Sequence, residues 1–254
     1  MREDPVWMPA ATAARIHYRI AGMEDVQIRR DLPYKTVSSE TWLFDYYTPL
    51  EPLANPPPIA ILIHGGPIPA NLLTGPTRWG NFESLGRLIA ASGLGAVMFN
   101  HRFFAPQAVV DAVEDLRDLI ATLSTYAGEL RLDPSRLCLW AFSGGGVLLT
   151  PFLRDTPEAI RCMVAYYAVM DARLDGNASR IPPLLIARAG LDAASLNSAL
   201  DDFVQQALRR NVSIDVLNHP RGQHVFDCRD DNERTRDILR RTVEFIRNNL
   251  TSTT

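Results

Sequence analysis

Residues Leu137–Leu149 read LCLWAFSGGGVLL. The apolar residues before Ser143 predict a buried strand, and those after the glycines predict a helix. Ser143 then lies at a sharp strand-to-helix turn, where the residues two before and two after must be small because strand and helix pack tightly. Ala141 and Gly145 occupy these two positions. The pattern A-x-S-x-G is one methyl group away from G-x-S-x-G, in which the turn exposes a serine hydroxyl above a sheet.

The rest of the chain alternates short apolar segments with longer segments of helical spacing. Eight segments have strand character: Val26–Arg30, Thr41–Tyr47, and the segments PIAILIHGG, LGAVMFNHR, RLCLWAFS, CMVAYYAVMD, PPLLIARAGLD and VSIDVLNHP. Such alternation predicts an α/β fold with a mostly parallel eight-stranded sheet flanked by helices. The first two strands have no helix between them, so we expect an antiparallel edge. We divide the chain into an N-terminal segment, 1–25, and one catalytic domain, 26–250.

Polar residues follow several of these strands, and ligands of such sheets bind beyond the carboxyl ends of the strands. Ser143 follows one strand, Asp192 another, and His224 the last. An imidazole can take the proton of a serine hydroxyl, and a carboxylate behind it fixes its tautomer. The order Ser143, Asp192, His224 is the nucleophile–acid–base order of the nucleophile-elbow architecture. We therefore predict these three residues as a catalytic triad.

Glycines supply the backbone N–H groups that such a site needs for the oxyanion of the tetrahedral intermediate. Gly144 directly follows the serine and is the expected first donor. The second donor is expected at Gly65 or Gly66, in the turn after the strand that ends at His64. These two glycines also permit the turn, so their structural and functional roles coexist.

Other residues compete for these roles. Ser143 and Asp192 could each be a helix N-cap, and Asp171 and Asp175 are alternative acids. His219 precedes a proline and is expected to be a structural loop residue. Arg102 is expected to hold its loop through hydrogen bonds. The run of Glu114, Asp115, Arg117 and Asp118 is expected to be a solvated helix face with one acid toward Arg102.

Four stretches besides the elbow resemble known motifs. HGGP resembles an HGG oxyanion loop, FNHRFFAP a Tyr-Arg-Leu-Ala-Pro segment, LRLDPSRLCLWAFSGGG an Asp-Pro-x-Arg lead-in to the elbow, and RGQHVFD a Gly-x-His-x-Phe turn. In this order they resemble the α/β-hydrolase superfamily, and within it the HGG-type carboxylesterases and dienelactone-hydrolase-like proteins. Dienelactone hydrolases use a cysteine nucleophile, whereas this chain has Ser143. The resemblance implies an α/β-hydrolase fold and a serine esterase.

The remaining features restrict the function further. About a dozen residues separate Asp171 from the strand at Pro183, which is too few for a large cap domain, so small to medium carboxylic esters are the expected substrates. We expect no cofactor and no metal, because metal-ligand and nucleotide motifs are missing. The alternatives are a peptidase or amidase of prolyl-oligopeptidase-like type and a non-catalytic ligand-binding homologue.

Composition addresses partners and location. The net charge is −3 and there is no long basic run, so we expect no nucleic-acid partner. No apolar stretch has membrane-spanning length, so we expect no membrane partner. Three cysteines and no signal peptide favour the reducing cytoplasm. The apolar, aromatic N-terminal segment is expected to cover the pocket mouth, to join a homodimer contact, or to pack on the sheet edge.

Overall fold

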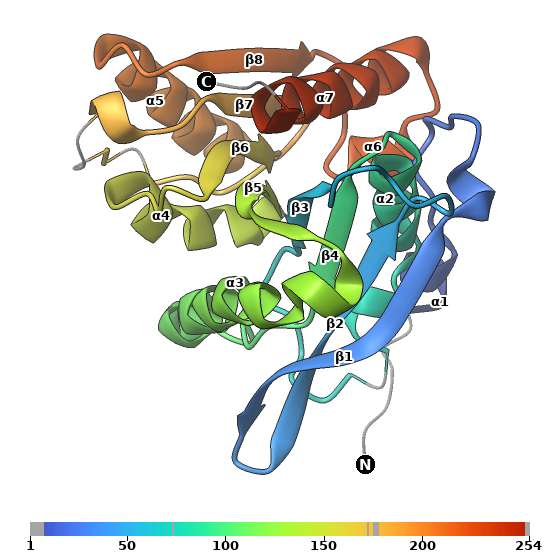
Figure 1. The fold of residues 1–254 in the computed structure, drawn as a ribbon. Helices are drawn as coiled ribbons and strands as arrows, with labels where there is room; N and C mark the ends of the chain where they lie inside the picture. The colour runs from blue at the N-terminus through green and yellow to red at the C-terminus, as the bar shows by residue number, and fades with distance from the viewer. Residues whose placement is uncertain (1–7, 73, 172, 175–177, 252–254) are drawn as a thin grey trace. The chain divides into compact units, whose positions relative to one another are not determined.

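The computed structural model describes residues 8–72, 74–171, 173–174 and 178–251 (Figure 1). Eight strands form one sheet in the order β1-β2-β4-β3-β5-β6-β7-β8. Their bounds are β1 Gln27–Val37, β2 Glu40–Thr48, β3 Pro58–Ile63, β4 Gly95–Phe99, β5 Asp133–Phe142, β6 Ile160–Tyr166, β7 Leu184–Ala189 and β8 Ile214–His219. β1 and β2 pair antiparallel, whereas β6, β7 and β8 pair parallel. The predicted eight-stranded, mostly parallel sheet with an antiparallel edge is confirmed.

The first of two compact units contains residues up to Leu62 and residues Gly66–Pro134. β1 and β2 form a hairpin whose two turn residues, Ser38 and Ser39, both have positive φ angles of 47° and 69°. Such a two-residue turn matches the right-handed twist of its strands. Helix α2 (Gly80–Ala91) packs on β2 and β4, and helix α3 (Val109–Leu130) packs on β1. Both faces of the fully buried strands β3 and β4 are therefore apolar along their length.

The second unit contains Ile63–Gly65 and the chain from Ser135 onward. Its helical elements are η4 (Ser143–Leu149), α4 (Thr150–Arg154), η5 (Ala178–Arg180), α5 (Ala194–Arg209), α6 (Phe226–Arg229) and α7 (Glu233–Thr251). Helix α7 packs on β6, β7 and β8, and α5 packs on β7 and β8. The residues after β5, β7 and β8 carry the predicted triad, so this unit holds all three of its members.

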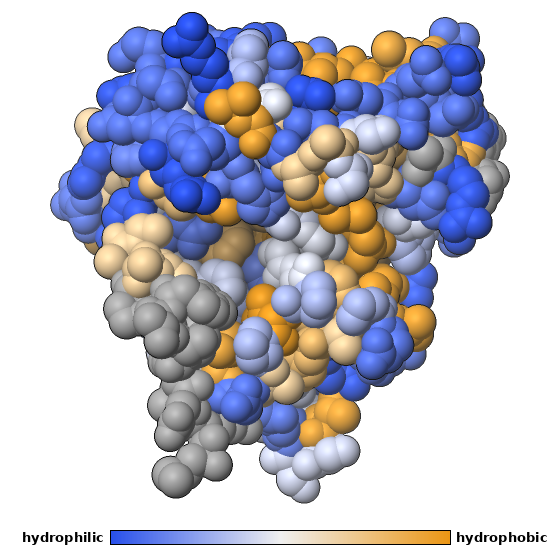
Figure 2. Space-filling model, turned by 180° about the vertical axis from the view of Figure 1, so that it is seen from behind, coloured by the Kyte–Doolittle hydropathy of each residue, from blue (hydrophilic) through white to orange (hydrophobic). Residues whose placement is uncertain are grey.

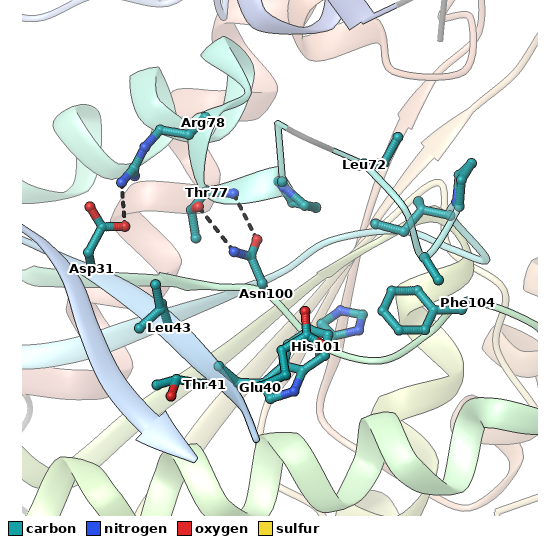
Figure 3. Close-up of a pocket in the computed structure, with 16 residues that line it drawn as sticks. Asp31, Glu40, Thr41, Leu43, Leu72, Thr77, Arg78, Asn100, His101 and Phe104 are labelled. Atoms are coloured by element: carbon teal, nitrogen blue, oxygen red, sulfur yellow. Dashed lines mark hydrogen bonds and ion pairs between the residues drawn. The ribbon is translucent and has the colours of Figure 1, made fainter. Parts of the chain in front are cut away.

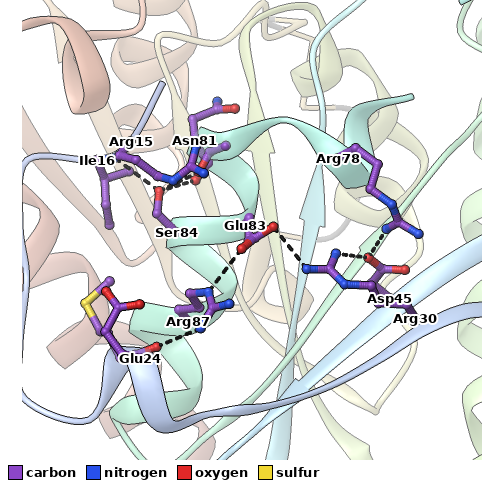
Figure 4. Close-up of polar contacts among 12 residues, drawn as sticks. Arg15, Ile16, Glu24, Arg30, Asp45, Arg78, Asn81, Glu83, Ser84 and Arg87 are labelled. Atoms are coloured by element: carbon purple, nitrogen blue, oxygen red, sulfur yellow. Dashed lines mark hydrogen bonds and ion pairs between the residues drawn. The ribbon is translucent and has the colours of Figure 1, made fainter. Parts of the chain in front are cut away.

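The N-terminal segment packs on α2 in the part that the structure describes. Helix α1 (Met8–Ala13) and the turn η1 (Met23–Asp25) both contact α2. The backbone N–H of Ile16 donates to Oγ of Ser84 (Figure 4). Arg87 donates to the carbonyl of Met23. The part of the segment before Met8 lies outside the described residues. A role as a cover or a dimer contact stays a prediction.

A buried carboxylate joins β2 to its surroundings in the first unit. Asp45 is only 1% exposed, and its oxygens accept hydrogen bonds from Arg30, Arg78 and the backbone N–H of Asp31 (Figure 4). Arg30 also pairs with Glu83 on α2. Burial raises the pKa of Asp45, although both guanidinium groups act in the opposite direction. The β1–β2 hairpin is thus linked to α2 by charged groups as well as by apolar packing.

As expected, one acid of the charged run on α3 faces Arg102 while the rest of the run is solvated. Asp115 is fully buried, whereas Glu114, Arg117 and Asp118 are exposed. Asp115 accepts hydrogen bonds from the guanidinium and the backbone N–H of Arg102, and from Nζ of Lys35. Its neighbours on the helix surface, Ala112 and Leu119, are also buried, so position 115 belongs to the inward face. The expected contact between Arg102 and one acid of this run is present.

The surface is mainly hydrophilic on the face that Figure 2 shows, with hydrophobic areas between. The large hydrophobic side chains that are most exposed come from separate elements: Leu50, Val110, Leu191 and Leu208. No helix within the described ranges combines the length and apolar character needed to cross a membrane.

Candidate active site

Ser143 lies at the first position after β5 and begins the turn η4. Its φ angle is +50°, in the left-handed region that residues other than glycine rarely adopt. The backbone N–H of Val169 donates to the carbonyl of Ser143 at 2.9 Å and fixes the turn. The predicted helix after the serine begins as a 3-10 turn and becomes the short helix α4 only at Thr150. Backbone strain of this kind gathers at functional sites.

The three predicted triad residues lie in one chain of hydrogen bonds. Oγ of Ser143 is 2.9 Å from Nε2 of His224, and Nδ1 of His224 is 2.5 Å from Oδ2 of Asp192. A carboxylate only accepts, so Nδ1 is the donor to Asp192 and Nε2 is left to accept from the serine hydroxyl. The side chain of Asp192 is 6% exposed, whereas that of His224 is 31% exposed. The imidazole therefore meets solvent while the carboxylate behind it is shielded.

The competing residues have other partners. Asp171 accepts from the backbone and guanidinium of Arg173, and these bonds lower the pKa of its carboxyl. Asp175 lies outside the described residues. His219 ends β8, where it is 3% exposed and has Nε2 3.3 Å from Oγ1 of Thr235. These contacts are structural, and Asp192 is the acid that reaches His224.

The glycines of the elbow sit where no side chain fits. A Cβ on Gly145 would lie 2.5 Å from the carbonyl oxygen of His64, and one on Gly146 would lie 2.5 Å from that of Val169. Distances under 3.0 Å force the backbone to move. The predicted close packing at position 145 is present, and Gly146 has the same requirement. Ala141, the departure from the glycine pattern, is fully buried with its methyl group in place.

The backbone after β3 reaches the serine through Gly65. A Cβ on Gly65 would lie 2.9 Å from Cβ and 3.5 Å from Oγ of Ser143. Nδ1 of His64 donates to the carbonyl of Gly65 at 2.7 Å, because a carbonyl oxygen can only accept. Burial lowers the pKa of His64 to about 4, so its imidazole is neutral at pH 7. His64 therefore fixes the orientation of the peptide group next to the nucleophile.

Gly66 belongs to the first unit. A Cβ there would lie 2.4 Å from the ring of Phe103, and the next peptide bond, to Pro67, is cis. The backbone N–H of Ile68 donates to the carbonyl of Phe103 at 3.0 Å. These contacts require glycine at position 66. Its predicted role as an oxyanion donor stays a prediction.

Sequence reasoning missed Tyr167, which lies beside the imidazole, and Asp227, which Tyr167 contacts. The ring of Tyr167 has its centroid 4.8 Å from that of His224, and its hydroxyl donates to Oδ1 of Asp227 at 2.7 Å. Tyr167 is 3% exposed and Asp227 is fully buried. Tyr167 stands in an apolar segment that looks like ordinary core. The sequence signal for Asp227 is an acid three residues after the base, in HVFD.

No cluster of three or more histidine, cysteine, aspartate or glutamate side chains that could hold a metal ion occurs among the described residues. Cys138 and Cys162 are free and buried, and Cys228 is free and half-buried. Burial raises the pKa of Cys228, so its thiol stays protonated at neutral pH.

The first unit has a cavity of its own, of about 310 Å³ (Figure 3). Apolar side chains on its wall include Trp42, Leu43 and Phe104, and the rings of Trp42 and Phe104 are 5.8 Å apart. On its lining, the side chain of Asn100 bonds both the backbone N–H and the hydroxyl of the neighbouring Thr77 (Figure 3). Charged and polar side chains, among them Asp31, Glu40 and Arg78, also line this cavity.

Comparison with known proteins gives one family match in sequence. Residues 44–153 match the BD-FAE family model. No curated protein matches the sequence.

Solved structures match nearly the whole chain. A thermostable esterase from Pseudomonas putida is 14% identical with a TM-score of 0.73, over 97% of this chain and 89% of its own. A bacterial heroin esterase is 16% identical with a TM-score of 0.73, over 96% and 89%. A propionate-bound thermophilic esterase from Thermogutta terrifontis is 17% identical with a TM-score of 0.70, over 91% and 98%. The chain therefore has the α/β-hydrolase fold of these esterases.

Proposed function

We propose that this protein is a serine hydrolase that cleaves small to medium carboxylic esters. The single observation that carries the proposal is the hydrogen-bonded series from Ser143 through His224 to Asp192, with the serine on a left-handed turn. A serine hydroxyl needs an adjacent base, and the base needs an orienting partner. Oγ of Ser143 lies 2.9 Å from the imidazole of His224, which serves as the base, and the imidazole lies 2.5 Å from the orienting carboxylate of Asp192.

In the first step Oγ of Ser143 attacks the ester carbonyl carbon while Nε2 of His224 takes its proton. The carbonyl oxygen becomes an oxyanion, for which the backbone N–H of Gly144 is the proposed first donor. The second donor comes from the turn after β3, at Gly65 or Gly66. Gly65 is supported by its contact distance to Ser143. Preorganised donors at this position stabilise charge that develops only in the transition state.

The intermediate then collapses to an acyl-enzyme. The bond between the carbonyl carbon and the alkoxy oxygen breaks, and His224 gives its proton to the leaving alcohol. In the second step a water molecule transfers a proton to Nε2 and attacks the acyl carbon. The carboxylic acid leaves, and the proton returns to Oγ of Ser143. The carboxylate of Asp192 stabilises the imidazolium in both steps. No cofactor is required for this sequence.

The proposed substrate class rests on two supports. The structural relatives are called esterases, one of heroin and one with bound propionate. Between β6 and β7, the described residues hold a single helical turn, η5, so no large cap is built there. Free cysteines support a reducing location, for which we propose the cytoplasm.

The test uses a fluorophosphonate probe and short p-nitrophenyl esters on the wild type, Ser143→Ala and a control. Ser179→Ala serves as the control, because Ser179 lies in η5 and outside the hydrogen-bonded series. We expect labelling and ester turnover in the wild type and the control, and neither above background in Ser143→Ala. Ester turnover in Ser143→Ala equal to that of the wild type would overturn the assignment of the nucleophile.

The same experiment separates the alternatives. Probe labelling with cleavage of peptide or amide substrates but not esters would identify a prolyl-oligopeptidase-like peptidase or amidase. Absence of both labelling and turnover in a folded wild type would identify a non-catalytic ligand-binding homologue. Size-exclusion chromatography with light scattering would show whether the protein is a homodimer.

A further inference from the structure

The imidazole of His224 has a second neighbour besides Asp192 and Ser143. The ring of Tyr167 lies 4.8 Å from it between centroids, with 59° between the ring planes. Tyr167 directly follows β6 and is 3% exposed. Asp192 restrains the imidazole only at Nδ1, so the ring could still tilt about that bond. The aromatic ring limits this tilt from the side.

Tyr167 is itself anchored on its far end. Its hydroxyl donates to Oδ1 of Asp227 at 2.7 Å, and Asp227 is fully buried. Burial, and then the nearby carboxylate of Asp227, raise the pKa of Tyr167. The phenol therefore keeps its proton and remains a donor at any pH at which the enzyme would work. The backbone N–H of Tyr167 donates to the carbonyl of Ala187 on β7 at 2.7 Å, so the main chain of Tyr167 is also held in place.

Asp227 lies three residues after His224, in the first turn of α6. Asp227 contacts Tyr167, and Tyr167 contacts His224. Together with the chain from His224 to Asp227, these contacts form a closed loop of interactions. Phe226, fully buried between them, packs edge-on against Tyr167 with centroids 5.5 Å apart. Any drift of the loop backbone at positions 224–227 would have to break one of these contacts.

The backbone in this closed loop is strained at two residues that are not glycine. Tyr167 has a φ angle of +38°, and Val225, a β-branched residue, has one of +63°. Such conformations persist only where surrounding contacts over-determine them. The hydrogen bond between Tyr167 and Asp227 connects the two strained segments, so it is well placed to maintain both.

We propose that Tyr167, anchored by Asp227, is a positioning residue that holds the imidazole of His224 in line with Ser143. The inference rests on the function proposed above. As His224 gains a proton in each step, the adjacent aromatic ring also lies within the distance at which a π face attracts a cation. Tyr167 acts through the imidazole and has no bond to the reacting atoms.

The test compares two tyrosines that are adjacent in the sequence. Tyr166 is also fully buried, and its hydroxyl bonds Thr242 at 2.6 Å, with no bond to the triad. Tyr167→Phe and Tyr166→Phe each remove one buried hydroxyl. We expect Tyr167→Phe to lower kcat by about tenfold with little change in KM, because misaligned catalytic groups slow the chemical step. We expect Tyr166→Phe to stay within about twofold of the wild type.

A spectroscopic readout tests the geometry without turnover. The proton on Nδ1 of His224 should give a downfield proton resonance that is lost in His224→Ala. We expect it to exchange with water faster in Tyr167→Phe than in Tyr166→Phe. If both variants match each other in kcat and in this exchange, the inference is overturned. If the wild type has no activity but the resonance behaves as expected, the proposed function fails while the positioning contact stands.

Tyr167→Phe removes the hydroxyl that donates to the buried carboxylate of Asp227, so a second variant is needed in case the first does not fold. The double variant Tyr167→Phe/Asp227→Leu removes both partners and avoids a stranded buried charge. We expect it to fold and to show the same loss in kcat. In Asp227→Asn the amide oxygen still accepts from the hydroxyl, so we expect near-normal kcat. A folded double variant with the kcat of the wild type would overturn the proposal.

Discussion

Nδ1 of His64 lies 2.7 Å from the carbonyl oxygen of Gly65, the residue next to it in the chain. Burial holds the pKa of this imidazole at about 4, below its ordinary value of 6.5. A neutral, fully buried ring thus supports the turn beside the nucleophile. It also links the stability of the fold to pH.

We expect stability to fall as the pH drops from about 6.5 to about 4. In this window the unfolded state binds a proton at His64 that the folded state does not, so the free energy of unfolding decreases with falling pH. The contribution is about 1.4 kcal/mol per pH unit. Urea unfolding of the wild type and His64→Asn between pH 7.5 and 4.5 measures it. The amide can still donate to Gly65 but does not titrate, so the variant should show a shallower decline. Parallel curves would contradict the assignment.

Asp192 and Asp171 give a matched pair for the acid. We expect Asp192→Asn to lower kcat by about a thousandfold or more, because the imidazole loses the partner that fixes its tautomer. Asp171→Asn should keep the activity of the wild type, since Asp171 bonds Arg173. Ester turnover at saturating substrate measures both. A larger loss in Asp171→Asn than in Asp192→Asn would reverse the assignment.

Asp115 and Asp118 test the buried ion pair of α3. Asp115 is fully buried beneath Arg102, whereas the side chain of Asp118 is 50% exposed beside Lys35. We expect Asp115→Ala to destabilise the protein by about 3–5 kcal/mol, because it strands the partly buried guanidinium of Arg102. Asp118→Ala should remove less than about 1 kcal/mol. Urea unfolding at pH 7 compares them, and equal losses would refute the role assigned to burial.

Alanine substitutions at Gly145 and Gly128 compare a glycine that close packing requires with a glycine in a helix that has room for a side chain. A Cβ at position 145 would lie 2.5 Å from a backbone oxygen, while one at position 128, in α3, meets nothing within 4 Å. We expect Gly145→Ala to destabilise by about 1–3 kcal/mol through overpacking. Gly128→Ala should stabilise by about 0.5–1 kcal/mol, because alanine suits a helix interior better than glycine. Thermal unfolding distinguishes the two signs.

The strand segments and the strand ends that carry polar residues could be predicted from the sequence, because continuous apolar segments mark buried parallel strands. The contact of Ser143 with His224 was predicted because both follow strands and stand in the nucleophile–acid–base order. Asp192 was harder to distinguish from Asp171, since both follow strands. Only the structure shows that Asp171 bonds Arg173 and that Asp192 bonds His224.

Other features depended on tertiary contacts. Asp115 belongs to a charged run that suggests solvent exposure, yet it lies on the same helix face as buried Ala112 and Leu119. The serine turn continues as a 3-10 element because Gly145 and Gly146 pack against backbone oxygens there. Tyr167 resembles any core tyrosine until its ring is seen beside His224.

Ser143, Tyr167 and Val225 all hold left-handed backbone conformations without being glycine. Glycine at any of the three positions would relieve the backbone strain. It would also delete the side chain there: the attacking hydroxyl of Ser143, the buried ring of Tyr167 beside the imidazole, or the side chain of Val225 next to His224. The strain therefore accompanies side chains that the proposed activity needs, and a selection on turnover would preserve it.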